Sequence, residues 1–202
     1  MTCQMPGSGQ TTQRTLLASG ALATGALALA YGPDKPWFYD PAQSGGGCVM
    51  DLGIHLVDLA LWLLDFPNVE HVSSTLFAGG EPVWDRSRHT EDYGVATLAL
   101  AGGTVVRIAC SWRLHAGRDA VISTAVHGTD GGATMRNVAG SFYDFTAERY
   151  RGTSTETIAA PPDSWGGRAA AEWARGVAAG GRFDPTAERF VTIAAVLDRI
   201  YG

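Results

Sequence analysis

The chain has 202 residues, enough for one sizeable hydrophobic core or for one domain with a tail. Its composition, 46% hydrophobic and 17% charged, is that of a globular protein and argues against disorder. The net charge of −5 offers no positive surface for nucleic acid or for an anionic membrane, so neither is an expected partner. The three cysteines are widely spaced, without a metal-binding or disulfide-framework pattern, and we expect no metal site.

The first thirty residues allow two interpretations. Residues 1–15 are polar and aperiodic, and we expect a disordered leader there. In one interpretation, residues 14–30 are an export signal, with Arg14 as its charged start and Ala28-Leu29-Ala30 as its cleavage site. In the other interpretation, a short helix ends at residues 16–18 and a strand covers about residues 26–31. We favour this second interpretation because a single arginine is a weak charged start for an export signal. The protein would then be cytoplasmic.

The sequence contains no phosphate-binding loop of a recognised kind. Gly7-Ser8-Gly9 begins like a dinucleotide fingerprint, but position 12 is threonine and no apolar strand precedes it. We therefore expect this chain to bind no nucleotide cofactor by itself.

Residues 31–47 form a predicted loop, because three prolines and a triple glycine interrupt any regular pattern. Trp37 and Tyr39 lie inside it. Aromatic side chains in a loop can line a site for a sugar-like ligand, although they also commonly cover the edge of a core.

Residues 48–64 predict a buried helix that is apolar on nearly all sides. Asp51, His55 and Asp58 interrupt it at positions i, i+4 and i+7, which share one face at 3.6 residues per turn. Burying such groups without partners would cost roughly 1–3 kcal/mol each, so they must bond to one another or face a wet cleft. A histidine oriented by carboxylates suits general acid/base chemistry. The alternative is a satisfied polar network within the core.

The remainder predicts a sheet closed by two helices, with His115 in the loop 113–118 as a further candidate ligand contact. Glycine turns and short connections favour antiparallel pairing of neighbouring strands. The expected strands cover residues 72–78, 95–101, 104–113, 120–128, 133–138, 142–150 and 153–159. Residues 166–179 and 185–201 predict the helices, in which Trp165 and Trp173 are expected to pack.

The predicted fold class is α+β: an open-faced, mostly antiparallel sheet with helices packed on one face and no Rossmann domain. The strand 104–113 alternates an apolar face with a face of small residues and arginine. An open sheet face of this width usually finds a partner, often a second copy of the chain, so a homo-oligomer is expected.

The run SGGGCVMDLGIHLVDLALWLL, from Ser44 to Leu64, resembles the signature of a known family. It is similar to the carboxy-terminal domain of the glucose–fructose oxidoreductase/inositol dehydrogenase/rhizopine-catabolism (Gfo/Idh/MocA) family. Weaker matches follow at residues 91–94, 111–112, 128–132 and 190–201. The resemblance covers about residues 16–202 and implies one domain of the dihydrodipicolinate reductase-like C-terminal type.

The resemblance implies an NAD- or NADP-dependent dehydrogenase in which a separate Rossmann domain binds the cofactor. Such enzymes oxidise a hydroxyl of a sugar, cyclitol or related polyol. By motif matching, His55 is the catalytic histidine, Asp51 its acidic companion and Asp58 the residue that orients the imidazole. Asp34-Lys35-Pro36 superficially resembles the family's catalytic lysine motif, but that motif belongs to the Rossmann half, so Lys35 receives no role.

Two hypotheses follow. The chain is the substrate and oligomerisation half of an NAD(P)-dependent oxidoreductase, inactive alone or active only with a Rossmann domain supplied separately. Alternatively, it is a non-enzymatic polyol-binding or scaffold module, exported if residues 14–30 are a signal.

Overall fold

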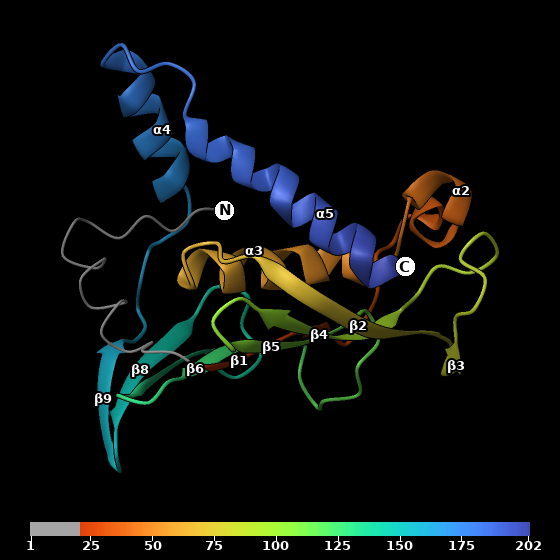
Figure 1. Cartoon of the computed structure of the whole chain (residues 1–202), viewed down its shortest axis with the longest axis horizontal. Helices are drawn as coiled ribbons and strands as arrows, with labels where there is room; N and C mark the ends of the chain where they lie inside the picture. Colours follow the sequence, from red (N-terminus) through yellow and green to blue (C-terminus); the bar gives the residue numbers. More distant parts are fainter. Residues whose placement is uncertain (1–20) are drawn as a thin grey trace.

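The computed structural model describes residues 21–202, so the expected leader and the helix end at residues 16–18 lie outside the described residues. The described chain builds one nine-stranded sheet in the order β3-β2-β4-β5-β1-β6-β7-β8-β9 (Figure 1). The strands are β1 (Leu22–Leu29), β2 (Val69–Ala78), β3 (Glu81–Pro82), β4 (Tyr93–Leu100), β5 (Val105–Ser111), β6 (Ala120–His127), β7 (Gly132–Asn137), β8 (Phe145–Arg151) and β9 (Ser154–Ala159). The seven strands expected between residues 72 and 159 are therefore confirmed, with β3 added to them.

The strand expected near residues 26–31 is confirmed, but it begins earlier, at Leu22. It lies in the middle of the sheet, parallel to β5 on one side and antiparallel to β6 on the other. All other pairings in the sheet are antiparallel. The mostly antiparallel sheet that the sequence predicts is thus present, with one parallel pair at its centre.

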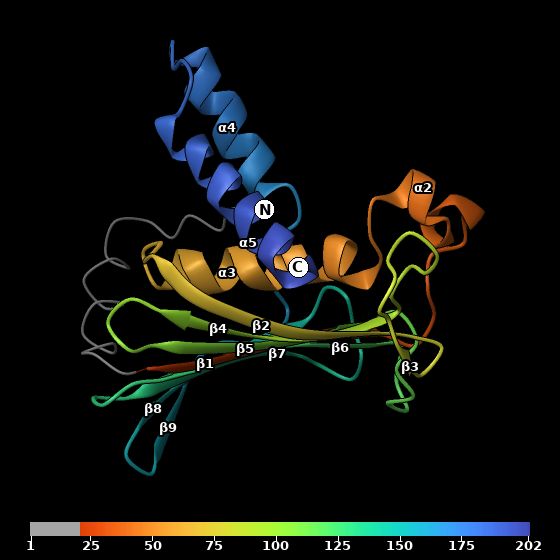
Figure 2. The same cartoon turned by 45° about the vertical axis from the view of Figure 1, so that its right-hand side comes forward.

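Two helices cover one face of this sheet. The helical segments are η1 (Pro36–Tyr39), α2 (Pro41–Ser44), η2 (Val49–Gly53), α3 (Ile54–Leu63), α4 (Arg168–Ala178), η3 (Pro185–Glu188) and α5 (Arg189–Tyr201). Helix α3 packs on β1 and β5, and α5 packs on α3 and β2. Figure 2 shows both helices on the same side of the sheet, whereas no helix of residues 21–202 covers the other side. The open-faced α+β fold is therefore confirmed.

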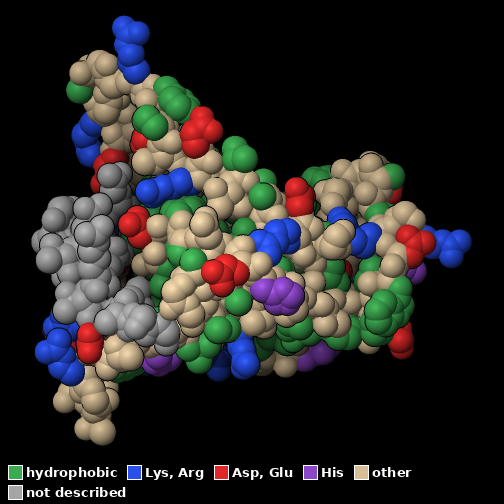
Figure 3. All heavy atoms as spheres, viewed as in Figure 1, with side chains coloured by type: hydrophobic (Ala, Val, Ile, Leu, Met, Phe, Trp, Pro, Cys, Tyr) green, Lys and Arg blue, Asp and Glu red, His purple; other side chains and the backbone are tan. Residues whose placement is uncertain are grey.

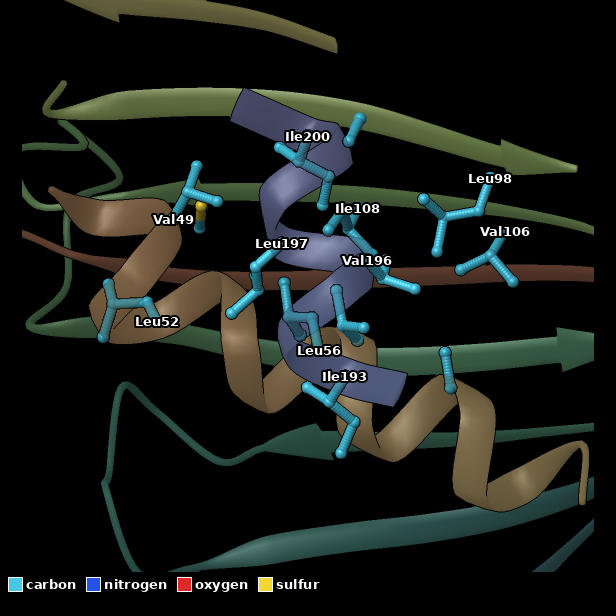
Figure 4. Close-up of a cluster of buried hydrophobic side chains, with 14 of the residues drawn as sticks. Val49, Leu52, Leu56, Leu98, Val106, Ile108, Ile193, Val196, Leu197 and Ile200 are labelled. Atoms are coloured by element: carbon cyan, nitrogen blue, oxygen red, sulfur yellow. The ribbon is translucent and has the colours of Figure 1, made fainter. Parts of the chain in front are cut away.

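The hydrophobic core lies between the sheet, α3 and α5 (Figure 4). Val57 and Leu61 of α3 are fully buried, because the sheet lies on one side of the helix and α5 on another. Gly25 in β1 allows this close packing: a Cβ atom at that position would lie 3.1 Å from Leu56. Close packing of this kind leaves little freedom for α3 to shift or rotate.

Helix α4 departs from the prediction that two helices close the sheet. None of its residues is buried, and Trp173, which we expected to pack, is 72% exposed. Trp165 does pack, edge-on against Phe145 with ring centroids 6.2 Å apart. Together α4 and the beginning of α5 form an arm that projects from the body (Figure 2) and exposes hydrophobic side chains (Figure 3).

The helical run Pro41–Leu63 has the length and apolar composition of a membrane span. Its second half is α3, the helix at the centre of the core. A core helix passes the same test of length and composition, so the run carries no argument for a membrane.

Candidate functional site

The segment that carries the predicted polar stripe is not one regular α-helix. It opens with a π-helical turn, Val49–Gly53, and continues as α3 from Ile54. A π-helical turn contains more residues than an α-helical turn, so Asp51 and His55 do not keep the regular i, i+4 spacing that the sequence suggests. Single π-helical turns inside α-helices frequently occur at functional sites.

Asp51 has a partner that the sequence pattern does not reveal. Its carboxylate Oδ2 accepts a hydrogen bond from the indole Nε1 of Trp112 at 2.9 Å. Trp112 follows the end of β5 and is fully buried, so this bond ties the π-helical turn to the end of the sheet. Asp51 itself is half-buried.

His55 is exposed on α3, and half-buried Asp58 follows it by three residues. Within residues 21–202, no hydrogen bond joins His55 to Asp51 or to Asp58. Burial raises the pKa of the Asp58 carboxyl above its ordinary value, while the neighbouring His55 opposes that shift. The three residues therefore lie along adjacent turns without forming a closed network.

The aromatic residues of η1 meet the same tryptophan. Tyr39 lies edge-on to Trp112, with ring centroids 5.5 Å apart, and its hydroxyl donates to the carbonyl oxygen of Pro33 at 3.0 Å. The guanidinium of Arg113 lies 5.4 Å from the centre of the Tyr39 ring, within cation–π distance. Tyr39 and Asp51 thus contact the same indole, from the loop and from the helix respectively.

Trp37 lies at the outer side of this cluster. It stacks on Phe38, with ring centroids 3.9 Å apart, and is 45% exposed. Phe38 in turn lies edge-on to Trp112 at 6.0 Å. A half-exposed indole stacked on a second ring offers an apolar surface on which a sugar ring could lie.

His115 is not brought to this cluster by any described contact. It is exposed in the loop between β5 and β6, and among the described residues it forms no hydrogen bond or ring contact with the others. Its predicted role in ligand contact stays a prediction. The sequence pattern does not reveal Trp112 and Arg113 as members of this cluster, because their contacts with Asp51 and Tyr39 join segments far apart in the chain.

The triple glycine before the helix does not provide a site for a dinucleotide. A pyrophosphate group binds at a helix N-terminus through free backbone N–H groups. Here the N–H groups of Gly47 and Val49 donate to the carboxylate of Glu91, at 2.9 and 3.1 Å. The buried carboxylate occupies the position that a phosphate would need, so this helix start does not fit NAD or NADP.

Cys48 and Cys110, the two cysteines within residues 21–202, do not form a reactive pair. Cys48 and Cys110 are buried free thiols with their sulfur atoms 3.8 Å apart. The hydrogen bond between the two thiols and their burial raise the pKa of Cys48, which keeps it protonated and unreactive. In the described chain, no three His, Cys, Asp or Glu side chains gather as metal ligands would.

The fold defines a class of proteins. GenD2 from gentamicin A biosynthesis, solved in complex with NAD, superposes with a TM-score of 0.70 and 23% identity, over 96% of this chain and 55% of that one. KijD10, a 3-ketoreductase from Actinomadura kijaniata solved with NADP and TDP-benzene, gives 0.73 and 16%, over 98% and 58%. The aldose-aldose oxidoreductase of Caulobacter crescentus, solved with glycerol, gives 0.73 and 18%, over 95% and 55%. At these identities the likeness shows the fold, that of the second domain of such oxidoreductases.

The family follows from the sequence comparison. Residues 16–134 match the model of the GFO/IDH/MocA C-terminal domain, and the chain belongs to this family. The D-glucoside 3-dehydrogenase of Escherichia coli K12 is 27% identical over a 107-residue alignment, which covers 48% of this chain and 30% of that protein. The chain thus spans a little more than half of the solved structures named above, and the match covers less than a third of the curated relative.

Replacing Asp58 with asparagine tests the electrostatics of α3. Burial favours the neutral carboxyl in the folded chain, so ionised Asp58 lowers the free energy of unfolding at neutral pH. We expect Asp58→Asn to raise the urea midpoint at pH 7, with a gain that shrinks as the pH falls into the acid range, because the raised pKa lets the wild-type carboxyl take up a proton in the folded chain before it does in the unfolded chain. Asp130→Asn, which changes an exposed carboxyl on a turn, is the control. An equal gain at every pH would contradict this account.

Proposed function

We propose that this chain is the substrate-binding and oligomerisation domain of an NAD(P)-dependent oxidoreductase that acts on the CH–OH group of a sugar, cyclitol or similar polyol. The observation that carries the proposal is exposed His55 on the core helix, between Asp51 and Asp58. The family to which the chain belongs and the names of its relatives support the reaction class.

In this proposal His55 removes the proton from the substrate hydroxyl, since its imidazole is accessible and can accept one. Asp51 keeps one oxygen bonded to Trp112, which holds the carboxylate in place while the other oxygen accepts a substrate hydroxyl. Asp58 orients His55 electrostatically from three residues further along α3. Trp37 and Tyr39 line the sugar on the loop side, and His115 contacts it from the loop that follows β5.

In this proposal the oxidant is held by another domain, which is supported by the triple-glycine start of η2 being filled by the Glu91 carboxylate. We therefore expect this chain to be inactive alone and to work with a separate Rossmann domain. Since β1 at residues 22–29 is a central strand, removing it as part of an export signal would destroy the sheet; this supports a cytoplasmic location.

The proposed reaction is tested by pairing the chain with the nucleotide-binding domain of a family relative. Reduction of NAD or NADP is followed by absorbance with sugars, glycosides and cyclitols as substrates. We expect His55→Ala to lower turnover by about 10²–10⁴-fold, the usual contribution of a general base, and to leave the melting temperature nearly unchanged because the side chain is exposed. His71→Ala, which changes an exposed histidine on β2, is the matched control.

Unfolding of the His55→Ala chain with unchanged turnover per folded molecule would assign His55 a structural role instead. Polyol binding by the isolated chain, without turnover in any pairing, would favour the non-enzymatic alternative. Exposed Trp37, stacked on Phe38, is the feature that would serve such binding.

The projecting arm supports the need for a second domain. Helix α4 has 11 residues, none of them buried, and helices of this length are marginal in water without tertiary packing. Its apolar residues and those that follow remain largely exposed; Phe183, for example, is 71% exposed. The exposed set is Trp173, Val177, Phe183, Phe190 and Val191. We assign this arm to the contact with the Rossmann domain.

Hydrogen exchange tests the arm. In the isolated chain, amides of Arg168–Ala178 are expected to exchange within seconds, while those of Ile54–Leu63 stay protected by the core. Adding the nucleotide-binding domain should slow exchange in Arg168–Ala178, and Trp173→Ser should abolish that effect. Protection of α4 equal to that of α3 in a monomeric isolated chain would contradict the assignment.

The uncovered face of the sheet is the proposed oligomer interface. Its central strands present small side chains together with Arg107, as expected from the alternation of β4 and β5. Val95 pairs with Ala109 and Thr97 with Arg107 on this face. Flat surfaces of small side chains allow two sheets to pack closely, so a second copy is the proposed occupant.

Replacing Ala109 with glutamate tests this interface. A carboxylate at the centre of the face would lose its water in a dimer, which is costly, but would stay hydrated in a monomer. We expect light scattering to give a multiple of the chain mass for the unaltered protein and a single chain mass for Ala109→Glu. Thr155→Glu, on the edge strand β9, should leave the mass unchanged. A monomeric unaltered chain at micromolar concentration would contradict the proposal.

A further inference from the structure

Three stretches of the chain that are far apart in sequence meet at the beginning of the π-helical turn. They are Gly46–Val49 before and in η2, Glu91 just before β4, and Tyr201 at the end of α5. Glu91 is only 2% exposed, and no cation neutralises it among the described ion pairs. A buried carboxylate needs hydrogen bonds to offset its loss of water. The groups that donate to Glu91 therefore show which part of the structure it stabilises.

The partners of Glu91 are backbone groups and one hydroxyl. Its Oε1 accepts hydrogen bonds from the N–H groups of Gly47 and Val49, and one from the Tyr201 hydroxyl at 2.7 Å. The backbone carbonyl of Glu91 accepts the N–H of Cys48 at 3.0 Å. The Tyr201 hydroxyl in turn accepts the N–H of Met50 at 3.0 Å. Four successive N–H groups at the start of the turn are therefore satisfied by two residues.

This junction also explains two of the three glycines by close approach. A Cβ atom on residue 46 would lie 2.2 Å from the Tyr201 hydroxyl oxygen. On residue 47 it would lie 1.9 Å from the carbonyl oxygen of Glu91. Any other residue at either position would push Glu91 or Tyr201 away from the turn.

The same junction is connected by backbone hydrogen bonds to both Asp51 and Trp112, the two residues whose side chains are hydrogen-bonded at the candidate site. Asp51 follows Met50 directly, and its N–H donates to the carbonyl of Gly47 at 3.0 Å. Trp112 donates its backbone N–H to the carbonyl of Asp92, the residue after Glu91, at 2.9 Å. Glu91 and Asp92 thus hold the turn that carries Asp51 and the backbone that carries Trp112.

We propose that Glu91 and Tyr201 are positioning residues for the candidate site: together they fix the π-helical turn so that Asp51 stays bonded to Trp112. Through this turn, the C-terminal end of α5 supports the geometry of the site. The inference rests on the proposed function only where it treats Asp51 and His55 as catalytic; the positioning itself is tested without turnover.

The protonation of Tyr201 suits this role. Burial and the adjacent Glu91 carboxylate raise the pKa of the Tyr201 hydroxyl above its ordinary value. The hydroxyl therefore stays protonated at physiological pH and continues to donate to Glu91.

The test uses the Trp112 indole as a reporter in the complete 202-residue chain. The signal of its Nε1–H in ¹H–¹⁵N spectra is identified by its loss in Trp112→Phe. We expect Tyr201→Phe, which keeps the ring but removes the hydroxyl, to shift or split this signal and to speed exchange of the proton by about tenfold, as expected for a weakened hydrogen bond. Glu91→Gln keeps an acceptor oxygen and should produce a smaller change in the same direction.

Tyr150→Phe is the matched control, since the Tyr150 hydroxyl donates to Glu148 at 2.9 Å on β8, away from the turn. It should leave the Trp112 signal unchanged. An unchanged Trp112 signal in folded Tyr201→Phe and Glu91→Gln would overturn the proposal and reduce both residues to general stabilisers. Should Glu91→Gln fail to fold, Tyr201→Phe decides alone.

The outcome is separable from that of the proposed function. A moved Trp112 signal together with unaffected turnover in His55→Ala would retain the positioning by Glu91 and Tyr201 and reject the catalytic role of His55. An unmoved Trp112 signal together with a large loss of turnover in His55→Ala would reject the positioning by Glu91 and Tyr201 and retain the catalytic role of His55.

Discussion

The packing of α3 between the sheet and α5 is the constraint on which the candidate site depends. Val57 and Leu61 are fully buried on the covered sides of the helix, so only one direction remains open for polar side chains. His55 is exposed on this helix, and Asp58 is half-buried. Since close packing prevents the helix from rotating, the exposure of His55 is a property of the whole core and not of a local preference.

Much of the fold is readable from the sequence because its signals are local. Alternation in β4 and β5 and the glycine turns between strands predict the strands within a few residues. The motif from Ser44 to Leu64 leads to the correct family. The parallel pairing of β1 with β5 could not be predicted in this way, because it depends on which distant strand reaches the centre of the sheet.

The candidate site is harder to predict from the sequence, because it too depends on contacts between segments that are far apart in the chain. A period of 3.6 residues places Asp51, His55 and Asp58 on one face, but the π-helical turn changes the direction of Asp51. The capping of that turn by Glu91 and Tyr201, and the bond of Asp51 to Trp112, join segments separated by up to 151 positions. Periodicity within one helix carries no information about such contacts. The exposure of Trp173 is likewise hidden from the sequence, since an amphipathic pattern does not say what will cover the apolar side.

The central place of β1 has a consequence for how the protein is made. Residues 22–29 can complete their hydrogen bonds only after residues 105–111 and 120–127 have been synthesised, because both neighbours come much later in the chain. Until then the apolar residues 22–29 have no strand to pair with on either side. This favours slow folding and contact with chaperones during translation. The middle of this sheet therefore forms only after β6 has been synthesised, although β1 leaves the ribosome well before its two neighbours.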